Sequence, residues 1–369
     1  MTKPIKILYT IPNFDTAGSG KVVYDLIQGL DKSRFSPEIC CFHTQGEYFK
    51  VIETLNVPIH VFNFTTEYKP LITLPFRILK IALFFKKHRF QLIHSWHWSS
   101  DFTEPLAAKL AGIPFVYTKK AMGWGNKSWT WRSKLSSKII AINRDMMTLF
   151  FLKLKEKTIY MPLGVDTNLY RPLQKSRIIP EGIRFEDSDF VIVSVANLVP
   201  IKGIEVLLDA VKIMDDVSLK VLIVGDNENA YGQSLKQNYQ SDNILFLGKK
   251  MDVIPYLSVA DVFVIPTKDE GRKEGLPIAP LEAMACQRLV VGSKISGIKD
   301  VLQPFDDCLF TSGDSLDLSE KLLDLRHYSE NERDAKARKM RDFVNVNFSL
   351  MSCIKAHEAL YLEFKNNNR

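Results

Sequence analysis

The chain has 369 residues, of which 46% are hydrophobic and 25% charged, and its formal net charge is +7. This length predicts about two domains, and the apolar share is sufficient for two cores. No apolar run approaches the roughly 20 residues that a membrane-spanning helix needs, and the N-terminal MTKPIKILYTIPNF has a strand pattern, not that of a signal peptide. The cysteines lack metal-ligand spacing and predict reduced thiols in a cytoplasmic protein. They are Cys40, Cys41, Cys286, Cys308 and Cys353.

The charge is spread unevenly along the chain. Residues 1–165 hold 23 Lys and Arg against 11 Asp and Glu, a net of +12, whereas residues 166–369 hold 26 against 31, a net of −5, and the two sum to +7. A basic first half predicts an anionic partner: a membrane surface, a phosphorylated acceptor or nucleic acid. The sequence contains no recognisable nucleic-acid-binding module, which argues against the last of these.

The first half alternates strand and helix patterns. The apolar run Ile5–Ile11 predicts a buried parallel strand, followed by a loop over 12–20 and a helix over 22–30. The loop contains Gly18 and Gly20, which could admit a phosphate close to the backbone or form a plain tight turn. Further strands are predicted over 37–42, 57–62, 90–95, 113–118 and 137–142.

Residues 74–90 predict a basic amphipathic helix, LPFRILKIALFFKKHRF. We expect Leu79, Leu83 and Phe84 to face inward. The basic residues expected to face outward are Arg77, Lys80, Lys86, Lys87 and Arg89. This pattern suits an ordinary surface helix of an α/β domain, or a patch that rests on an anionic bilayer.

Polar and aromatic residues gather at the carboxyl ends of two predicted strands. The strand over 90–95 contains His94 and leads into His97 and Trp98, which suit carbohydrate recognition or core packing. The strand over 113–118 leads into the loop KKAMGWGNKSWTW, which begins with Lys119 and Lys120. Residues 171–189 are polar with proline and glycine and are predicted to link the two domains.

The second half repeats the same alternation. A strand over 190–196 leads into the loop NLVPIKG and a helix over 204–214, and the region over 316–355 is predicted to be largely helical. Ser349 is a predicted cap for a last helix that runs to 364. Other strands are predicted over 219–224, 244–247, 261–266 and 288–292. Two successive runs of strands and helices predict two doubly wound parallel sheets.

The segment DVFVIPTKDEGRKEGLPIAPLEAMAC, residues 261–286, carries the strongest functional pattern. A strand, a polar loop and a helix predicted from Pro277 onward form the layout that holds anions at the carboxyl end of a sheet. Glu274 precedes this helix and Glu282 lies inside it. Such carboxylates suit sugar or ribose hydroxyls, because a carboxylate accepts two hydroxyl bonds at once.

The motifs NLVPIKG, VGD, FLG, ADVFVIPT and EGLPIAPLEAMA, in this order and spacing, resemble family 4 of the retaining glycosyltransferases. The resemblance is close over 190–300 and looser over 1–165. It implies an α/β protein of the GT-B fold: two Rossmann-like, doubly wound parallel-sheet domains facing a cleft, with a C-terminal helix crossing back to the first. The implied domains are an acceptor-side domain, 1–170 with about 350–369, and a donor-binding domain, 171–349.

The resemblance also implies an activity. It is the transfer of a sugar from a nucleotide diphosphate sugar to a saccharide or lipid-linked acceptor, with retained configuration and neither metal nor other cofactor. A UDP-sugar is the donor expected from family frequency. We expect a role in bacterial surface polysaccharide or glycolipid synthesis, in the cytoplasm at the inner face of the membrane.

Residue by residue, the resemblance implies that Lys202 contacts the donor diphosphate, that Glu274 meets the transferred sugar and that Glu282 binds the ribose. A fixed ammonium would stabilise charge on the departing phosphate, so Lys202 and Glu274 are the predicted catalytic pair. The other predicted donor-binding residues are Gly18, Asn197, Gly225, Asp226, Gly275, Leu276 and Pro277. The acceptor-side candidates are His94, His97, Trp98, Lys119 and Lys120.

The sequence departs from the family pattern at two places. An arginine five or six residues before the lysine is missing, since Asn197 stands five before Lys202, and Arg272 or Lys273 is the expected substitute. A histidine after the strand over 115–118 is replaced by Lys119 and Lys120, and a lysine is a poor general base unless its pKa is depressed.

These departures keep one alternative open, a non-catalytic nucleotide-sugar-binding partner. A second alternative is another GT-B enzyme such as a nucleotide-sugar epimerase, which needs no acceptor; the basic first half and its aromatic loops favour an acceptor instead. The sequence also contains the DxD pattern Asp187-Ser188-Asp189, which precedes a predicted strand instead of following one. It therefore predicts a solvated turn and not a metal motif.

Overall fold

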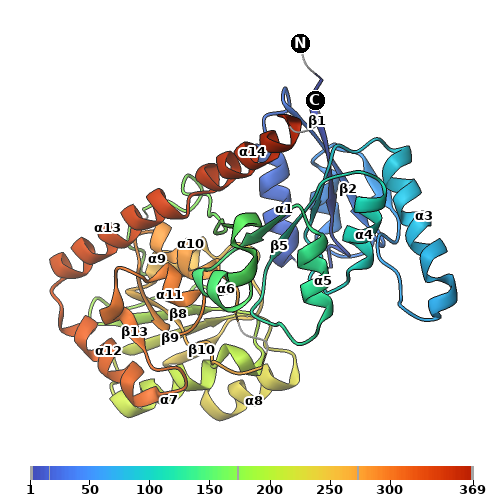
Figure 1. Cartoon of the computed structure of the whole chain (residues 1–369). Helices are drawn as coiled ribbons and strands as arrows, with labels where there is room; N and C mark the ends of the chain where they lie inside the picture. The colour runs from blue at the N-terminus through green and yellow to red at the C-terminus, as the bar shows by residue number, and fades with distance from the viewer. Residues whose placement is uncertain (1–2, 16, 173, 272–273, 367–369) are drawn as a thin grey trace. The chain divides into compact units, whose positions relative to one another are not determined.

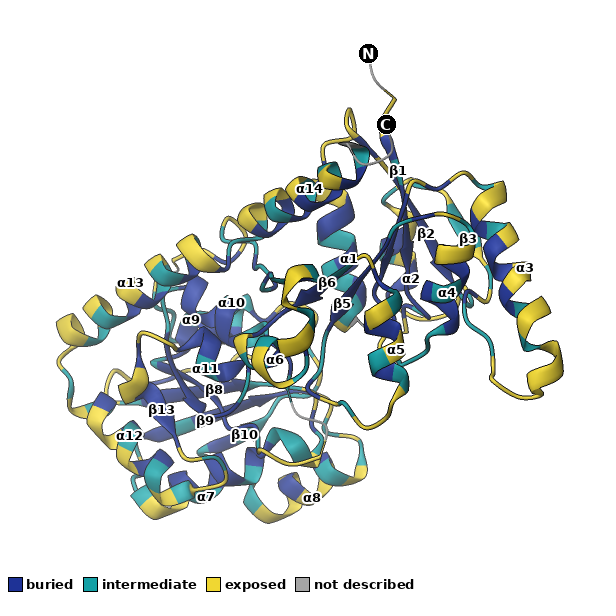
Figure 2. Ribbon diagram, in the orientation of Figure 1, coloured by how far each residue is buried: buried dark blue, intermediate teal, exposed yellow. Residues whose placement is uncertain are grey.

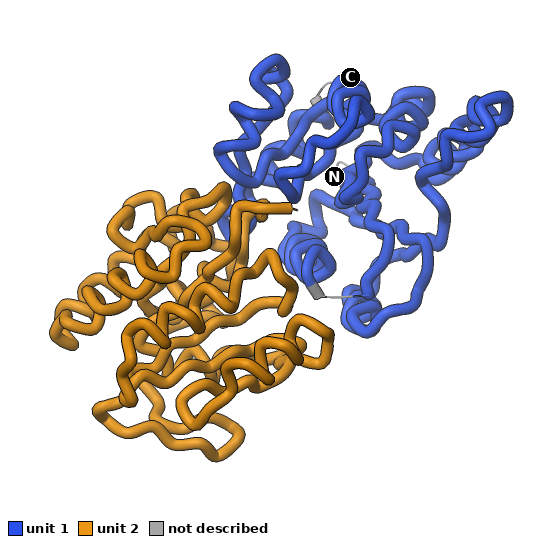
Figure 3. The backbone as a smooth tube through the Cα atoms, turned by 90° about the horizontal axis from the view of Figure 1, so that it is seen from below, with its two compact units in different colours: residues 1–163, 350–369 blue, residues 164–349 orange. Residues whose placement is uncertain are grey.

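The computed structural model describes residues 3–15, 17–172, 174–271 and 274–366. The chain divides into two compact units, coloured separately in Figure 3. Unit 1 comprises Met1–Leu163 and Leu350–Arg369, and unit 2 comprises Gly164–Ser349. The sequence-based limit at 170/171 lies a few residues beyond the first of these boundaries.

Unit 1 contains a seven-stranded sheet in the order β3-β2-β1-β4-β5-β6-β7, with every neighbouring pair parallel; Figure 1 labels β1, β2 and β5 among these strands. Its strands are β1 (Ile5–Thr10), β2 (Phe35–Cys41), β3 (Ile59–Val61), β4 (Leu92–Ser95), β5 (Phe115–Lys119), β6 (Lys138–Ala141) and β7 (Thr158–Tyr160). Its helices are α1 (Ala17–Gly29), α2 (Phe49–Glu53), α3 (Leu74–Lys87), α4 (Thr103–Leu110), α5 (Ser128–Leu135), α6 (Arg144–Leu149) and α14 (Leu350–Asn366), with short 3₁₀ turns η1 (Leu71–Thr73) and η2 (Leu152–Lys157). The central strands are buried, which explains their continuous apolar runs (Figure 2).

Helix α14, from the end of the chain, completes the core of unit 1. The hydroxyl of Tyr361 is 3.0 Å from that of Tyr9 on β1 and 2.7 Å from Nδ1 of His94 on β4. A Cβ atom at Gly29 of α1 would lie 2.1 Å from Cδ1 of Ile354, so the absence of a side chain at Gly29 allows the two helices to pack closely. The prediction that the last helix returns to the first domain is confirmed.

Unit 2 contains a six-stranded parallel sheet in the order β10-β9-β8-β11-β12-β13. Its strands are β8 (Phe190–Val195), β9 (Leu219–Val224), β10 (Ile244–Phe246), β11 (Val262–Ile265), β12 (Leu289–Ser293) and β13 (Leu309–Phe310). Its helices are α7 (Ile204–Met214), α8 (Ala230–Tyr239), α9 (Ile254–Val259), α10 (Ala279–Ala285), α11 (Ile298–Val301), α12 (Ser315–His327) and α13 (Glu330–Asn347), with 3₁₀ turns η3 (Pro200–Lys202) and η4 (Asp306–Cys308). The two doubly wound parallel sheets predicted from the sequence are therefore present.

Two helix starts differ from the sequence-based expectation. Helix α1 begins at Ala17, so Gly18 and Gly20 lie in its first turns and not in the preceding loop. Helix α10 begins at Ala279, and Pro277 belongs to the loop before it. Pro280 takes the first-turn position that proline tolerates, because its missing N–H has no partner there in any case.

Helix α3 buries a different face from the one predicted. Its buried residues are Ile78, Ile81, Ala82 and Phe85. The prediction that Leu79 and Leu83 face inward is wrong, since these side chains are 48% and 57% exposed. Phe84 is half-buried. Apolar residues occur on both sides of this helix, so periodicity alone could not select the packed side.

All five cysteines are buried free thiols. Burial raises the pKa of Cys41 to about 11 and that of Cys286 to about 12, so these thiols are protonated at neutral pH. Within the described residues, no helix combines the length and the apolarity needed to cross a membrane.

Candidate functional site

The sheet of unit 2 reverses its winding between β8 and β11. From β8 the chain proceeds outward to β9 and β10, whereas from β11 it proceeds to β12 and β13 on the other side. Ligands of open α/β sheets bind at the carboxyl ends of the two strands at such a reversal. The loops that follow β8 and β11 carry the residues predicted to be catalytic.

A glycine allows these two loops to meet. Gly203 has φ +62°, and a Cβ atom there would lie 2.3 Å from the carbonyl oxygen of Pro266. The backbone N–H of Lys268 donates to the carbonyl of Ile201 at 2.8 Å, which ties the loop after β11 to the loop after β8. The NLVPIKG motif therefore needs its glycine for both the left-handed conformation and the close approach.

The loop contact brings Lys202 and Glu274 together. The ammonium group of Lys202, at the end of η3, donates to the Glu274 carboxylate in an ion pair. Both side chains are 21% exposed, so the pair is neither buried in the core nor free in solvent. Two residues 72 positions apart thus share one charged site at the carboxyl edge of the sheet.

The predicted residues after β9 pack against the same edge. A Cβ atom at Gly225 would lie 2.0 Å from the carbonyl oxygen of Ala196, so only glycine lets these loops touch. Asn229 donates to the carbonyl oxygens of Leu198 and Asp226, at 3.0 and 2.9 Å, and fixes the two loops together. Asn197, at the position where the family often has arginine, is exposed at this edge.

The EGLP loop is held from its other side as well. Gly275, Leu276 and Pro277 are all buried. A Cβ atom at Gly297, where φ is +81°, would lie 2.2 Å from the Gly275 carbonyl oxygen. Glu282 lies in α10 beside Tyr170, and burial together with the Glu282 carboxylate raises the pKa of that tyrosine.

The substitute for the missing arginine is not found among the described residues of the loop over 267–275. Lys268 pairs with Glu205 at 2.8 Å and with Glu270 at 3.3 Å. Although burial opposes the change, hydrogen bonds from Lys268 and Tyr231 lower the pKa of Glu205. The proposed substitutes Arg272 and Lys273 lie outside the described residues.

Thr267 is a residue that sequence reasoning missed. It follows β11, and its hydroxyl oxygen is buried with no hydrogen-bond partner among the described residues. Its carbonyl oxygen accepts from Ser293 Oγ at 2.5 Å. The available signal was a hydroxyl residue directly after a buried strand, which is a common position for a ligand contact in α/β sheets.

Unit 1 has a corresponding reversal between β1 and β4. Gly18 lies in the first turn of α1, which follows β1, while His97 and Trp98 follow β4. Lys120, after β5, donates to Ser19 Oγ at 3.0 Å, and its ammonium lies 5.2 Å from the ring centre of Trp98. The structure therefore gathers residues from the start of α1 and from the loops after β4 and β5 at one edge of this sheet.

Two acceptor-side candidates lie inside the protein instead. His94 is fully buried, with Nδ1 hydrogen-bonded to Tyr361 and Nε2 to Thr118. The buried ammonium of Lys119 donates to the carbonyl oxygens of Ala121 and Gly123, at 2.6 and 2.7 Å. Both side chains support the core, which argues against a direct contact with an acceptor.

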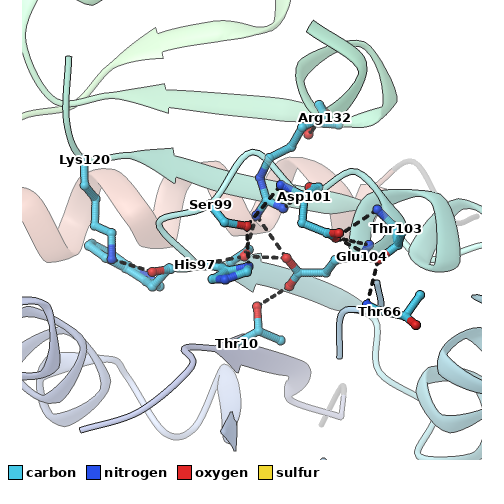
Figure 4. Close-up of polar contacts among 12 residues, drawn as sticks. Thr10, Thr66, His97, Ser99, Asp101, Thr103, Glu104, Lys120 and Arg132 are labelled. Atoms are coloured by element: carbon cyan, nitrogen blue, oxygen red, sulfur yellow. Dashed lines mark hydrogen bonds and ion pairs between the residues drawn. The ribbon is translucent and has the colours of Figure 1, made fainter. Parts of the chain in front are cut away.

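A buried polar network, missed by sequence reasoning, fixes the loop after β4 (Figure 4). The Glu104 carboxylate accepts from Thr10 Oγ1 at 2.5 Å, from Ser95 Oγ at 2.9 Å and from Arg132 Nη2 at 3.0 Å. Both charged side chains are completely buried. Burial raises the pKa of Glu104, and the charge of Arg132 opposes that rise. No sequence spacing links residues from such distant elements.

The network also influences the position and the protonation state of His97. Its backbone N–H donates to Ser95 Oγ at 3.3 Å, and its Nδ1 is 3.3 Å from Ser99 Oγ. Burial, reinforced by the charges of Arg132 and Lys120, lowers the pKa of His97 to about 3. The imidazole is therefore neutral at physiological pH and can offer a hydrogen bond but no charge.

The outer face of η1 and α3 carries an exposed apolar row, which we call the α3 stripe: Ile72, Phe76, Leu79 and Leu83. Ile72 and Phe76 are 82% and 73% exposed, and the residue spacing places all four on one side of the helical segment. The lysines Lys69, Lys80, Lys86 and Lys87 around it are also exposed. A contiguous exposed apolar patch marks an interaction surface.

The described residues contain no group of three or more His, Cys, Asp or Glu side chains that could hold a metal ion. The Asp187 and Asp189 pair lies in the turn before β8. Asp187 pairs with Arg177 at 3.2 Å, and Asp189 accepts from the backbone N–H of Glu186 at 2.8 Å.

The sequence of the chain is similar to those of known glycosyltransferases. The chain is 24% identical over 314 residues to the N,N'-diacetylbacillosaminyl-diphospho-undecaprenol alpha-1,3-N-acetylgalactosaminyltransferase of Campylobacter jejuni, covering 77% of this chain and 81% of that protein. Alignments with two other curated relatives span 52% and 62% of their lengths.

Solved structures match along nearly the whole chain. A glycosyltransferase from Rickettsia africae has a TM-score of 0.84 at 17% identity, covering 99% of this chain and 100% of that one. Anabaena Alr3699/HepE, in complex with UDP and glucose, has a TM-score of 0.77 at 20% identity, covering 97% and 99%. These likenesses show the fold, and the predicted GT-B architecture is confirmed.

Two family descriptions match the sequence: Glycosyltransferase Family 4 over residues 16–169 and Glycosyl transferases group 1 over residues 189–327. Together they span most of both units. The chain therefore belongs to family 4 of the glycosyltransferases, as the EGLP and VPIKG motifs indicated.

Proposed function

We propose that this protein is a retaining, metal-independent glycosyltransferase that moves a sugar from a UDP-sugar to a saccharide or lipid-linked acceptor. The observation that carries the proposal is the Lys202–Glu274 ion pair at the winding reversal of unit 2. UDP and glucose in the Anabaena structure support the donor, and the lipid diphosphate in the name of the Campylobacter relative supports the acceptor class.

The difficult step is the departure of the nucleoside diphosphate, because negative charge builds on its phosphate oxygens as the bond to the anomeric carbon breaks. A lysine already fixed at the carboxyl edge of the sheet stabilises that charge without reorganising at the moment of reaction. Glu274 is the ion-pair partner of Lys202 in the structure, and a donor diphosphate would compete with it for the ammonium group. When the diphosphate takes that partner's place, the carboxylate becomes available to sugar hydroxyls.

The donor is tested by thermal shift with uridine, guanosine and adenosine diphosphates. We expect uridine diphosphate to raise the melting temperature most, since a ligand that binds only the folded state stabilises it. A preference for another base overturns the assignment of the donor while leaving the class of reaction intact.

The reaction is tested by following release of uridine diphosphate from a labelled donor. We expect release to require an acceptor, and the product to retain the anomeric configuration of the donor. An isomerised sugar without acceptor would indicate an epimerase. Tight donor binding without any turnover would indicate a non-catalytic partner.

We also propose that the enzyme works at the cytoplasmic face of a membrane, docked through the α3 stripe. The exposed apolar row and its flanking lysines complement an anionic bilayer, where buried apolar side chains and surface charge both contribute. Co-sedimentation with phosphatidylglycerol vesicles should exceed that with phosphatidylcholine vesicles and should weaken as salt is raised. Equal partitioning to both vesicles at all salt concentrations contradicts this part of the proposal.

A further inference from the structure

An open pocket of about 440 Å³ lies in unit 1 at the carboxyl end of β3, the edge strand of the sheet. This volume is within the ~300–1,000 Å³ range of ligand pockets. Its polar lining comes from the loop after β3 and from α3, and its remaining lining is apolar. The polar residues are Asn63, Thr65, Thr66, Arg77 and Lys80. Two cations and no carboxylate in a lining indicate an anionic ligand.

Arg77 is held in place while part of its guanidinium is left unused. Its Nη2 donates to the carbonyl oxygen of Pro70 at 2.8 Å and its Nη1 to Thr66 Oγ1 at 3.3 Å. Its Nε is buried and has no hydrogen-bond partner among the described residues. A buried N–H without a partner costs free energy, so the cationic group of Arg77 is held in place beside the pocket at some cost to stability.

Thr66, which accepts a hydrogen bond from Arg77, is itself anchored to the buried network around Glu104. The backbone N–H of Thr66 donates to Thr103 Oγ1 at 3.1 Å, and Thr103 donates in turn to Asp101, as Figure 4 shows. The same network contains Glu104 and Arg132. The cation is therefore set by the core of the unit and not by a loose surface loop, which is what a preorganised site requires.

Among the residues that the structure describes, neither Arg77 nor Lys80 has a carboxylate within ion-pair distance. The guanidinium fork and the lysine suit phosphate oxygens in particular, because Arg offers several fixed donors and Lys a mobile point charge.

The pocket and the α3 stripe belong to the same helix. Arg77, Lys80 and Ile81 line the pocket, whereas Phe76, Leu79 and Leu83 lie on the exposed side. A free nucleotide or a sugar phosphate would use the pocket and leave the stripe in water. A molecule that joins phosphate to a hydrocarbon chain would use both.

We propose that this pocket binds the phosphate group of a lipid, whose hydrocarbon chain passes over the α3 stripe. The inference rests on the proposed function for its biological setting, since a lipid-linked acceptor carries such a phosphate. The head group of an anionic bilayer lipid carries the same chemistry. The pocket thus supplies a lipid-phosphate site distinct from the donor diphosphate site of unit 2.

The test is binding of farnesyl diphosphate to the full chain by isothermal titration calorimetry, with saturating UDP present to occupy the donor site. We expect Arg77→Gln/Lys80→Gln to weaken binding by about tenfold or more, because charge-assisted hydrogen bonds are lost. The control, Lys153→Gln/Lys155→Gln, removes the same charge from exposed residues of η2 in unit 1 and should bind like wild type. Equal affinity in all three proteins overturns the proposal.

Two further measurements identify the source of the phosphate. A raised KM for a lipid diphosphate-linked sugar in detergent, with the donor KM unchanged, supports the acceptor as ligand. Loss of binding to phosphatidylglycerol vesicles with both KM values unchanged supports a bilayer head group. If the pocket variant changes neither, the site does not serve a lipid phosphate. Because the farnesyl diphosphate measurement needs no turnover, it remains decisive even if the transferase activity is not found.

Discussion

The two units share one architecture but use their charged residues differently. In unit 2 the Lys202–Glu274 pair stands partly exposed at the carboxyl edge of the sheet, where it can exchange partners with a ligand. In unit 1 the Glu104–Arg132 pair is completely buried and supports the loop after β4. We therefore expect opposite effects from removing the two pairs. Loss of the sheet-edge pair should abolish activity and leave the fold intact, whereas loss of the buried pair should weaken the fold.

The largest effect should follow from breaking the buried pair. Glu104→Ala leaves the Arg132 guanidinium uncompensated in the core, and such a change typically costs about 3–5 kcal/mol of unfolding free energy. Urea denaturation measures it, with Glu53→Ala on the exposed side of α2 as control. A loss no larger than that of the control would show that the network does not support unit 1.

The edge pair should show the reverse behaviour. Lys202→Ala removes the cation that we propose faces the departing diphosphate, and we expect kcat to fall about 10²–10³-fold. The melting temperature should stay close to that of wild type, because the pair is partly solvated. Lys236→Ala, an exposed lysine of α8, is the matched control. Retained turnover in Lys202→Ala would remove the catalytic assignment.

A third prediction concerns the α3 stripe, the surface through which we propose that unit 1 docks on a membrane. Ile72→Ser/Phe76→Ser should reduce partitioning to phosphatidylglycerol vesicles by about tenfold or more, since two large apolar side chains no longer enter the bilayer. The control variant, Leu110→Ser/Leu149→Ser, removes two exposed apolar side chains of unit 1 that lie outside the α3 stripe, and it should partition like wild type. Equal losses in both variants would mean that α3 is not the docking face.

The last prediction is a pH dependence that arises from buried histidines of unit 1. Burial lowers the pKa of His97 to about 3 and that of His357 to about 4, against about 6.5 in an unfolded chain. As pH falls below about 6.5, these histidines bind protons in the unfolded chain but stay neutral in the folded chain. Unfolding free energy should therefore fall by up to about 1.4 kcal/mol per pH unit for each histidine, down to its folded pKa.

Urea denaturation of wild type and His357→Gln between pH 7 and pH 5 measures this slope. The variant should lose less stability over the interval, because one of the buried histidines is absent. Parallel slopes in the two proteins would indicate that His357 is not held neutral in the folded state.

Much of the fold could be predicted, because apolar strand runs and polar loops alternate clearly along the chain. The Lys202–Glu274 site was also within reach, since VPIKG and EGLP are local motifs whose loops follow adjacent strands. The packed side of α3 was not, because its sequence offers two apolar rows and contacts with neighbouring elements, α4 among them, decide between the rows. Nor could Glu104 and Arg132 be paired in advance: their contact depends on helices α4 and α5 coming together in the finished unit.

Helix α14 imposes an order on the making of this protein. Tyr361, His357 and Ile354 complete a core whose other members were synthesised more than two hundred residues earlier. While the chain is still emerging from the ribosome, unit 2 has all of its own strands and helices before the first sheet receives its last covering element. The core of unit 1 thus stays incomplete, with Tyr9 and His94 uncovered, until α14 has been synthesised.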